Sequence, residues 1–218
     1  DKEMNRSRLT NIILTTILVI GVAILVIQMQ NAKEKRNAKG AEYETAAAEM
    51  KTGEKSALDV IFSRKSVRHY TDREVEADKL LTLVKAGMAA PTAVNRQPWS
   101  FIIVTNMTQV ASISDKPGLM MLQKAKAVIL VLGKKDEKFW QQDCSAATEN
   151  ILLAAEALGL GAVWCAGHPL TDRTESYKAL FNYSDDYEVL SLISIGYPTG
   201  EDQPKDKYKE EKIHWNRW

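Results

Sequence analysis

Four residues near the start of the segment SRKSVRHYT, at 63–71, carry the side chains that an anion site needs. Arg64, Lys65 and Arg68 surround Ser66. The two arginines are four positions apart, so at a turn entering or leaving a helix both guanidinium groups can reach one phosphate while Ser66 and backbone amides complete its shell. The alternative, for this segment taken alone, is a solvated cluster of cations beyond a helix C-terminus.

A second polar segment is AAPTAVNRQPWSF, residues 89–101. Pro91 stops the preceding helical pattern, and Thr92, Asn95 and Gln97 follow in an irregular loop before the next strand. Hydroxyl, amide and backbone groups of this kind can bind a polar, planar ligand. The alternative is a capped loop whose Asn and Gln bond only to their own backbone.

Other kinds of site receive little support. The two cysteines, Cys144 and Cys165, are too few for a disulfide framework and are not spaced for a metal. The three histidines, His69, His168 and His214, are scattered without a partner at ligand spacing, so we predict no metal site. No Ser-His-Asp arrangement or spaced pair of carboxylates points to hydrolysis.

The composition limits the partners and the domain count. The chain has 218 residues, with 29 basic and 28 acidic side chains and a formal net charge of +1. No global field would recruit nucleic acid, so we predict no nucleic-acid partner and expect any anion site to be local. The length suits one well-buried domain with an appendage.

The appendage is the N-terminal segment 1–30. Large apolar residues dominate from Ile12 to Ile27, and no charged residue occurs between Arg8 and Lys33. As a helix, such a run can cross a hydrocarbon core about 30 Å thick. We therefore expect a single-pass membrane anchor, with a cleaved signal segment as the alternative. Basic residues on both sides leave its orientation open.

Residues 31–55 are rich in Ala, Glu and Lys and predict a charged helical linker. The folded domain should then occupy 56–218. Helical patterns occupy 76–90, 107–114 and 145–161, and Ser145 is placed to cap the last of them. Four short apolar runs predict buried strands at 100–105, 126–133, 162–167 and 190–198. Strands separated by helices indicate a layered sheet of the α/β type.

Five motifs in order then resemble the FMN-dependent nitroreductase family. They are R-x-S-x-R at 64–68, APTAVNRQPW at 90–99, AATENILLAAEALGLGAVW at 146–164, SIGYP at 194–198 and PKDKY…KIHWNRW at 204–218. The resemblance extends from Ser56 to Trp218. It implies a layered α/β (α+β) sandwich, the nitroreductase-like FMN-binding fold, and a homodimer with the flavin at the subunit seam.

The resemblance also implies a set of cofactor-binding residues. Its phosphate-binding segment matches Arg64, Lys65, Ser66 and Arg68. Its ribityl and ring loop, contributed by the neighbouring subunit, matches Pro91, Thr92, Asn95 and Gln97. Its backbone donors near the flavin pyrimidine edge match Trp164, Cys165, Ala166 and Gly167. Its basic tail, which closes over the phosphate, matches Lys205 and Lys207.

The function implied is an NAD(P)H oxidoreductase. NADH or NADPH would reduce FMN through N5, and a small-molecule acceptor such as a nitroaromatic or a quinone would then take the same place, in a ping-pong cycle. No catalytic side chain is predicted, because the flavin carries the chemistry. Two alternatives are a membrane-tethered FMN-binding or sensing module with little turnover and a reductive dehalogenase-like flavoprotein.

The homodimer has support from the residues as well. Trp215 and Trp218 lie in a charged tail and would be costly to leave in water, so we expect the tail to wrap onto a partner chain. The alternative is that both tryptophans pack on their own subunit. The apolar helix 145–161 is also too uniformly hydrophobic to have a wet face.

Overall fold

The computed structural model describes residues 21, 24, 27–34, 55–114 and 118–218. The chain divides into two units, Asp1–Glu54 and Lys55–Trp218. In the first unit, residues 27–34 are helical. No helix within the described residues is long and apolar enough to cross a membrane. Most of the predicted anchor and most of the predicted linker lie outside these residues.

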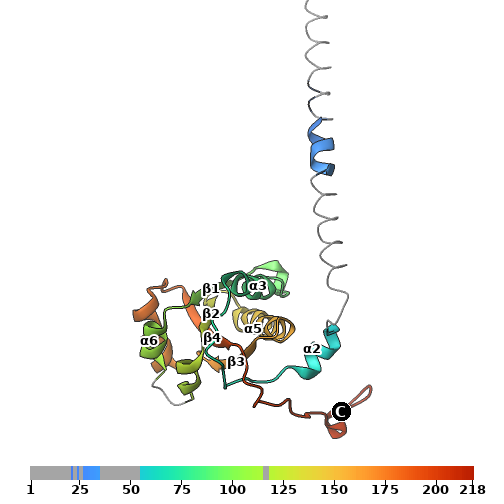
Figure 1. Ribbon diagram of the computed structural model, residues 1–218. Helices are drawn as coiled ribbons and strands as arrows, with labels where there is room; N and C mark the ends of the chain where they lie inside the picture. Colours follow the sequence, from blue (N-terminus) through green and yellow to red (C-terminus); the bar gives the residue numbers. More distant parts are fainter. Residues whose placement is uncertain (1–20, 22–23, 25–26, 35–54, 115–117) are drawn as a thin grey trace, which may run out of the picture. The chain divides into compact units, whose positions relative to one another are not determined.

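A four-stranded antiparallel sheet forms the centre of the second unit (Figure 1). Its strands are β1, Trp99–Val104; β2, Ala127–Lys134; β3, Gly161–Ala166; and β4, Tyr187–Gly196. They lie in the order β1-β2-β4-β3, so β1 and β3 are the edges. All four predicted strands are present, because each is an apolar run bounded by turn or charged residues.

The strand directions correct the expected sheet type. The regular alternation of strands and helices indicated an α/β sheet, whose strands are normally parallel, but every neighbouring pair here is antiparallel. Only the connection from β2 to β3 joins strands that run parallel, and even these two are not neighbours, because β4 lies between them. The connections β1–β2 and β3–β4 each join antiparallel neighbours, so each begins and ends at the same end of the strands, and the fold is α+β.

Helices cover both faces of the sheet (Figure 1). On one face are α3, Ala77–Met88, and α5, Trp140–Ala157; on the other are α4, Met107–Ile113, the 3₁₀ turn η2, Met120–Lys124, and α6, Thr171–Phe181. In β2, Ile129 packs in the first core and Leu130 in the second. Both faces are therefore apolar, and the strand reads as a continuous hydrophobic run.

Helix α5 is the long helix predicted at 145–161, but it begins five residues earlier. Ser145 lies inside the helix and does not cap it. The first turn instead packs the Trp140 ring, 7% exposed, into the core. The helix ends near the expected place, where Gly159 adopts φ +70°, a left-handed conformation that suits glycine. Within α5 only Gln141, Gln142 and Ala157 are exposed.

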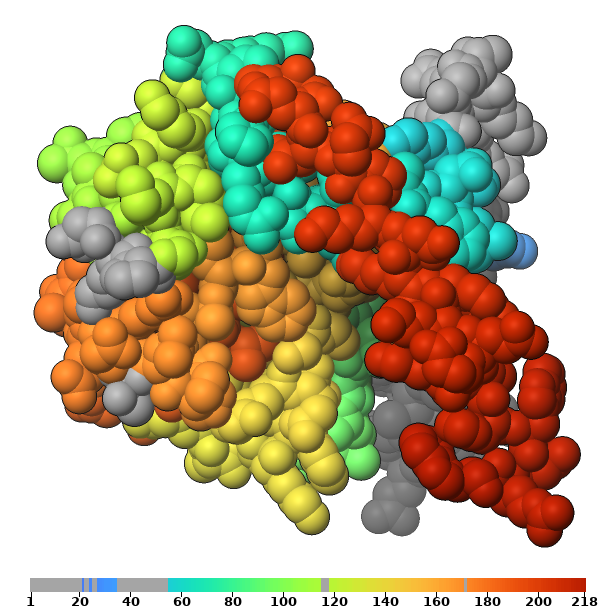
Figure 2. Space-filling model, turned by 90° about the horizontal axis from the view of Figure 1, so that it is seen from below, coloured from blue at the N-terminus to red at the C-terminus, as the bar shows by residue number. Residues whose placement is uncertain are grey.

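Two peripheral segments complete the unit. Helix α2, Ala57–Ser63, starts at a capping box in which Ser56 and Asp59 exchange hydrogen bonds. After β4 the chain is irregular to Trp218, apart from the 3₁₀ turn η3, Glu210–Lys212. Figure 2 shows this tail, in red, passing over the segment that follows α2 and over α2 itself. Trp215 and Trp218 are 83% and 99% exposed, so neither is buried by its own subunit, although the Trp218 ring lies 4.1 Å from that of His214.

Candidate functional site

The R-x-S-x-R segment is extended and lies along the outer edge of β3. Ser66 forms a parallel bridge with Ala162, and the Val67 N–H donates to the Ala162 carbonyl at 3.0 Å. Successive side chains of an extended chain point to opposite sides. Arg64, Ser66 and Arg68 therefore share one side, while Val67 is buried on the other. The segment does leave a helix, since α2 ends at Ser63, but it continues as an extended chain and not as the turn considered for the four-residue spacing.

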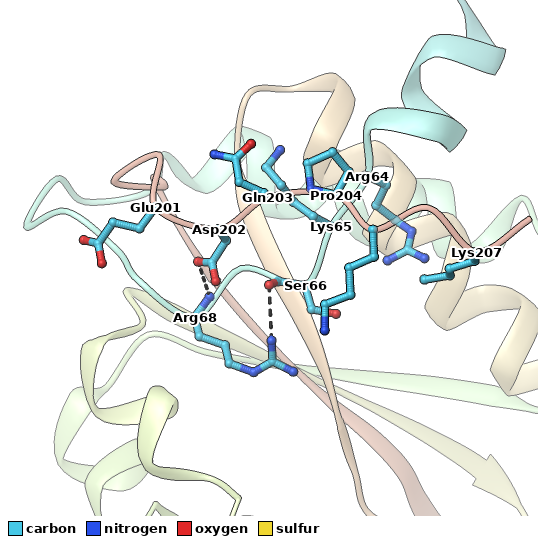
Figure 3. A pocket seen from close by; sticks show the side chains of 10 residues that line it. Arg64, Lys65, Ser66, Arg68, Glu201, Asp202, Gln203, Pro204 and Lys207 are labelled. Carbon is cyan, nitrogen blue, oxygen red and sulfur yellow. Dashed lines mark hydrogen bonds between the residues drawn. The ribbon is translucent and has the colours of Figure 1, made fainter.

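The shared side faces a cavity of about 550 Å³ between this segment and the C-terminal tail (Figure 3). The lining residues are mostly charged: Arg64, Lys65, Ser66, Arg68, Glu201, Asp202, Gln203, Pro204, Lys205 and Lys207. The structure thus brings together all six residues that the sequence analysis assigned to a phosphate. They come from two segments more than 130 positions apart in the chain.

Two of the cations are paired with carboxylates of α5. Arg64 Nε lies 2.9 Å from Glu149 Oε1, and Lys65 Nζ lies 3.2 Å from Glu156 Oε2. Glu156 is 9% exposed and also accepts from the Ser63 hydroxyl at 3.0 Å and from the Lys55 ammonium. Burial acts to raise the pKa of the Glu156 carboxyl, but hydrogen bonds from Lys55, Ser63 and Lys65 outweigh it and hold that pKa below its ordinary value.

The remaining donors fit a phosphate group. Among the described residues, no carboxylate forms an ion pair with the side chains of Arg68, Lys205 or Lys207. The Nε of Arg64 is buried and makes no well-directed hydrogen bond, although Glu149 is close. Such a set of cations, with the Ser66 hydroxyl beside it, can bind a dianion through charge-assisted hydrogen bonds.

Beyond the cavity, some backbone groups of strand β3 point outward from the edge of the sheet. Because the Ala162 carbonyl points outward to Val67, the peptide groups of Trp164 and Ala166 also face the outer edge. The Ala166 carbonyl accepts from the Arg173 guanidinium at 3.1 Å, and the Trp164 side chain is 37% exposed. Trp164 and Ala166 thus offer the backbone groups that the sequence analysis expected there.

The other two residues predicted on β3 face away from that edge. The Gly167 N–H donates to the Leu190 carbonyl on β4 at 3.0 Å, and the Cys165 thiol is buried against Met121. Burial raises the pKa of Cys165 to about 11, so the thiol is protonated at neutral pH. The assignment of Cys165 and Gly167 to the same row of donors does not match their geometry.

The loop 91–97 has a strained backbone. Val94, Asn95 and Gln97 have φ of 45°, 58° and 52°, a region that a β-branched residue such as valine rarely adopts. Gln97 donates to the Asn95 side chain at 2.8 Å, and its N–H donates to the Thr92 hydroxyl at 3.2 Å. Pro91, Asn95 and Gln97 are exposed, so the loop presents the side-chain amides of Asn95 and Gln97 outward.

Helix α5 anchors both this loop and the phosphate-type cavity, at different points. The buried carboxylate of Asp143 accepts from the Ala93 N–H at 3.0 Å, whereas Glu156 holds Lys65. Asp143 and Glu156 are thirteen positions apart, about 20 Å along a helix axis. None of the loop residues lines the cavity. Within one chain, the structure does not bring the two halves of the predicted site together.

Comparison with known proteins decides the family. A family model described as the Nitroreductase family matches residues 61–122 and 107–197. A protein of Archaeoglobus fulgidus, named a candidate NADH dehydrogenase/NAD(P)H nitroreductase, is 38% identical over 170 residues, covering 74% of this chain and 98% of its own. The chain belongs to the nitroreductase family. The resemblance inferred from the five motifs is confirmed, and the chain is an enzyme of the nitroreductase type.

Solved structures of nitroreductase-family proteins share the fold. A candidate NADH dehydrogenase/NAD(P)H nitroreductase from Parabacteroides distasonis is 43% identical and superposes with a TM-score of 0.73, over 76% of this chain and 100% of its own. An FMN-dependent nitroreductase from Clostridium difficile is 29% identical, with a TM-score of 0.69, over 73% of this chain and 98% of its own. The fold predicted for 56–218 is therefore the nitroreductase fold.

Four acidic residues of this nitroreductase-family chain were missed by the sequence analysis. Asp143, Glu149 and Glu156 on α5 anchor the loop and two of the cations, and Asp202 lines the cavity. Each is far along the chain from the group it contacts, so no local spacing indicated the contact. Glu149 and Glu156 also lie within a mostly apolar helical pattern, and Asp143 precedes the predicted start of that helix, so none of the three stood out.

Proposed function

We propose that this nitroreductase-family chain binds FMN, with the phosphate in the cavity between Arg64–Arg68 and the C-terminal tail. The single observation that carries the proposal is the convergence on one cavity of Arg64, Ser66 and Arg68 with Lys205 and Lys207. Related proteins with FMN in their names support it. The ribityl chain and ring would then extend along the edge of β3, where Trp164 and Ala166 offer peptide groups.

The proposed activity is oxidation of NADH or NADPH with transfer to a small-molecule acceptor such as a nitroaromatic or a quinone. Bound FMN would supply the hydride chemistry, with donor and acceptor occupying the same place in turn. The protein's share is binding and orientation: the cations hold the phosphate, and outward-facing peptide groups of β3 set the electrostatics at the ring edge. No side chain of this chain is required to exchange a proton.

A second copy of the chain completes the proposed site. Loop 91–97 lies away from the cavity of its own chain, and the exposed side chains of Asn95 and Gln97 would meet a flavin held by a partner. Exposed Trp215 and Trp218 also favour a partner chain that covers the tail. Sedimentation of a monomer that retains FMN would contradict this proposal.

The N-terminal segment is proposed to anchor the protein in a membrane, because residues 12–27 are apolar and no charge lies between Arg8 and Lys33. Full-length protein in washed membranes should stay in the pellet after alkaline carbonate extraction. Release into the supernatant would contradict the anchor.

The proposed activity is tested with the purified full-length chain. We expect a yellow protein with a flavin absorbance spectrum, from which denaturation releases FMN. Its absorbance should bleach under NADH or NADPH without oxygen and return when a nitroaromatic or a quinone is added. A protein that stays colourless in excess FMN would overturn the proposed cofactor. A yellow protein that does not oxidise NAD(P)H with any acceptor would instead be the FMN-binding module of the alternative.

A further inference from the structure

The carboxylate of Asp202 joins the C-terminal tail to the backbone of the R-x-S-x-R segment. One oxygen, Oδ2, accepts from the N–H of Arg68 at 2.9 Å and from the N–H of His69 at 3.2 Å. The Nδ1 of His69 lies 3.2 Å from the same oxygen. Figure 3 shows Asp202 pointing from the tail toward Arg68 across the rim of the cavity.

This contact is more buried than its place in an exposed tail suggests. The Asp202 side chain is 15% exposed, whereas that of its neighbour Glu201 is 65% exposed. Burial acts to raise the pKa of Asp202, but the two backbone hydrogen bonds and His69 outweigh it and lower that pKa. The carboxylate is therefore ionised at neutral pH.

Asp202 is also the last residue of the tail with a hydrogen bond to the rest of the described chain. Before it, the Thr199 N–H donates to the His69 carbonyl at 3.1 Å, and Pro198 forms a bridge with Tyr70. After it, the hydrogen bonds and the ring contact of residues 203–218 stay within the tail, and no hydrogen bond or ion pair joins them to the rest of the described chain. Lys205 and Lys207 follow the attachment by only three and five positions.

The charge of Asp202 is unfavourable for the ligand that we place beside it. A carboxylate in the wall of a phosphate cavity repels a dianion, so charge complementarity does not explain its presence. The geometry of Asp202 explains its presence. A short acceptor at this position satisfies two backbone N–H groups of the phosphate-binding segment and fastens the tail over them.

We propose that Asp202 is a positioning residue that fastens the C-terminal tail to Arg68 and His69 and so holds Lys205 and Lys207 at the FMN phosphate. The inference rests on the proposed cofactor site. It assigns Asp202 no contact with FMN. The residue acts on FMN binding through the two lysines.

The test compares binding of FMN with binding of riboflavin, which lacks the phosphate, by quenching of flavin fluorescence. Asp202→Ala removes the attachment and should weaken FMN binding about tenfold, the effect of losing one charge-assisted contact. Riboflavin binding should be unchanged. Asp202→Asn keeps an oxygen acceptor and removes the charge, so it should bind FMN at least as tightly as the wild type. Asp136→Ala, which removes an exposed carboxylate paired with Lys134 elsewhere, is the matched control and should change neither affinity.

A double-mutant cycle locates the effect. In a Lys205→Ala/Lys207→Ala background, Asp202→Ala should cause no further loss of FMN affinity, because the residues that it positions are gone. A full additional tenfold loss there would overturn the inference. So would an unchanged FMN affinity in Asp202→Ala, an equal loss for FMN and riboflavin, or an equal loss in Asp202→Asn.

A second measurement needs no flavin. Trypsin cleavage after Lys205 and Lys207 should be several-fold faster in the Asp202→Ala apoprotein than in the wild type or Asp136→Ala, because the tail is released. Equal cleavage rates would overturn the inference. A wild-type protein that binds FMN and riboflavin equally would instead overturn the phosphate assignment, and faster cleavage in Asp202→Ala would then leave only the fastening of the tail standing.

Discussion

Val67 packs directly against Gly161, where the extended phosphate-binding segment meets the first residue of β3. A Cβ placed on Gly161 would lie 2.5 Å from Val67 Cγ1 and 2.8 Å from its Cβ, closer than real contacts allow. The glycine therefore sets how near Arg64–Arg68 lies to the sheet, and this distance determines where the shared side of the segment faces the cavity.

We expect Gly161→Ala to force this segment away from the sheet. The cost should be about 1–3 kcal/mol of the free energy of unfolding, typical of overpacking in a buried position. FMN should also bind more weakly, because Arg64, Ser66 and Arg68 move together. Thermal and denaturant unfolding, with a flavin titration, measure both effects.

Val67→Ala provides the control for that prediction. Alone it leaves a small cavity and should also destabilise the protein. Combined with Gly161→Ala, it makes room for the added methyl group, so the double variant should be more stable than the sum of the two losses predicts. Simple additivity would show that Val67 and Gly161 do not determine the position of the segment.

The buried Glu156 predicts a dependence of stability on pH. Its pKa in the folded protein is below the ordinary value, so its contribution is fully present above the unfolded pKa and is lost as the pH falls toward the folded pKa. Glu156→Gln should therefore cost about 1 kcal/mol near pH 7, with the difference from the wild type shrinking below about pH 4.

Unfolding in denaturant across this pH range measures the Glu156 effect. Asp136→Asn alters an exposed carboxylate, 69% exposed, and should follow the wild type at every pH. A Glu156→Gln deficit that stays constant down to pH 3 would mean that packing, and not the charge of the carboxylate, accounts for the loss.

Arg68 should contribute to binding through the phosphate alone. Within the described part of the chain, its guanidinium donates one hydrogen bond, to the Ser66 carbonyl at 3.3 Å. Arg68→Ala should weaken FMN binding about 10- to 100-fold, as expected for a charge-assisted hydrogen bond, and leave riboflavin binding unchanged. The salt dependence of FMN binding should also become shallower, because one cation is lost.

Lys135→Ala is the matched control for Arg68, since it removes an exposed cation from the β2–α5 connection. FMN affinity should be unaffected in that variant. If Arg68→Ala weakened the binding of riboflavin as much as that of FMN, the side chain would be acting on the ring or on the fold, and the phosphate assignment would fail.

The strain at Val94 should be relieved by a residue that tolerates a left-handed backbone. Val94 has φ 45° and is 87% exposed, so its replacement removes little packing within the subunit. Val94→Asn should stabilise the protein by about 1 kcal/mol, because Asn adopts this conformation more readily. Thermal unfolding measured over a range of protein concentrations provides the readout.

The same variant tests the proposed second copy. If a partner chain covers the Val94 side chain, Val94→Asn should stabilise the isolated subunit but weaken its association. The variant should then be more stable than the wild type at low protein concentration and lose that advantage at high concentration. A destabilised Val94→Asn monomer would show instead that the valine makes contacts within its own subunit that its exposure does not suggest.

Much of the secondary structure could be predicted from local pattern. The strands at Trp99–Val104 and Ala127–Lys134 are runs of apolar residues, and the helix at Ala77–Met88 has apolar residues at helical spacing. Strand order could not be predicted this way. The insertion of β4 between β2 and β3 depends on pairing between strands about 60 residues apart, which leaves no periodicity in the chain.

The residues of the proposed cofactor site could likewise be predicted only in part. The cations of R-x-S-x-R, the amides of the loop 91–97 and the lysines of the tail were identified from residue types and order. The carboxylates that hold them were not. Asp143, Glu156 and Asp202 each act on a residue at least 50 positions away, and only the packing of α5 and of the tail brings them into contact.

By itself the sequence determined which side chains are able to bind a phosphate, because charge and hydrogen-bonding capacity belong to the residue type. Tertiary structure decided which of them face the cavity. Pairing with β3 makes the segment extended, so alternation places Arg64, Ser66 and Arg68 on one side and turns Val67 into the core. The tail then meets that segment through Asp202, because the N–H groups of Arg68 and His69 donate to its carboxylate and not to a strand.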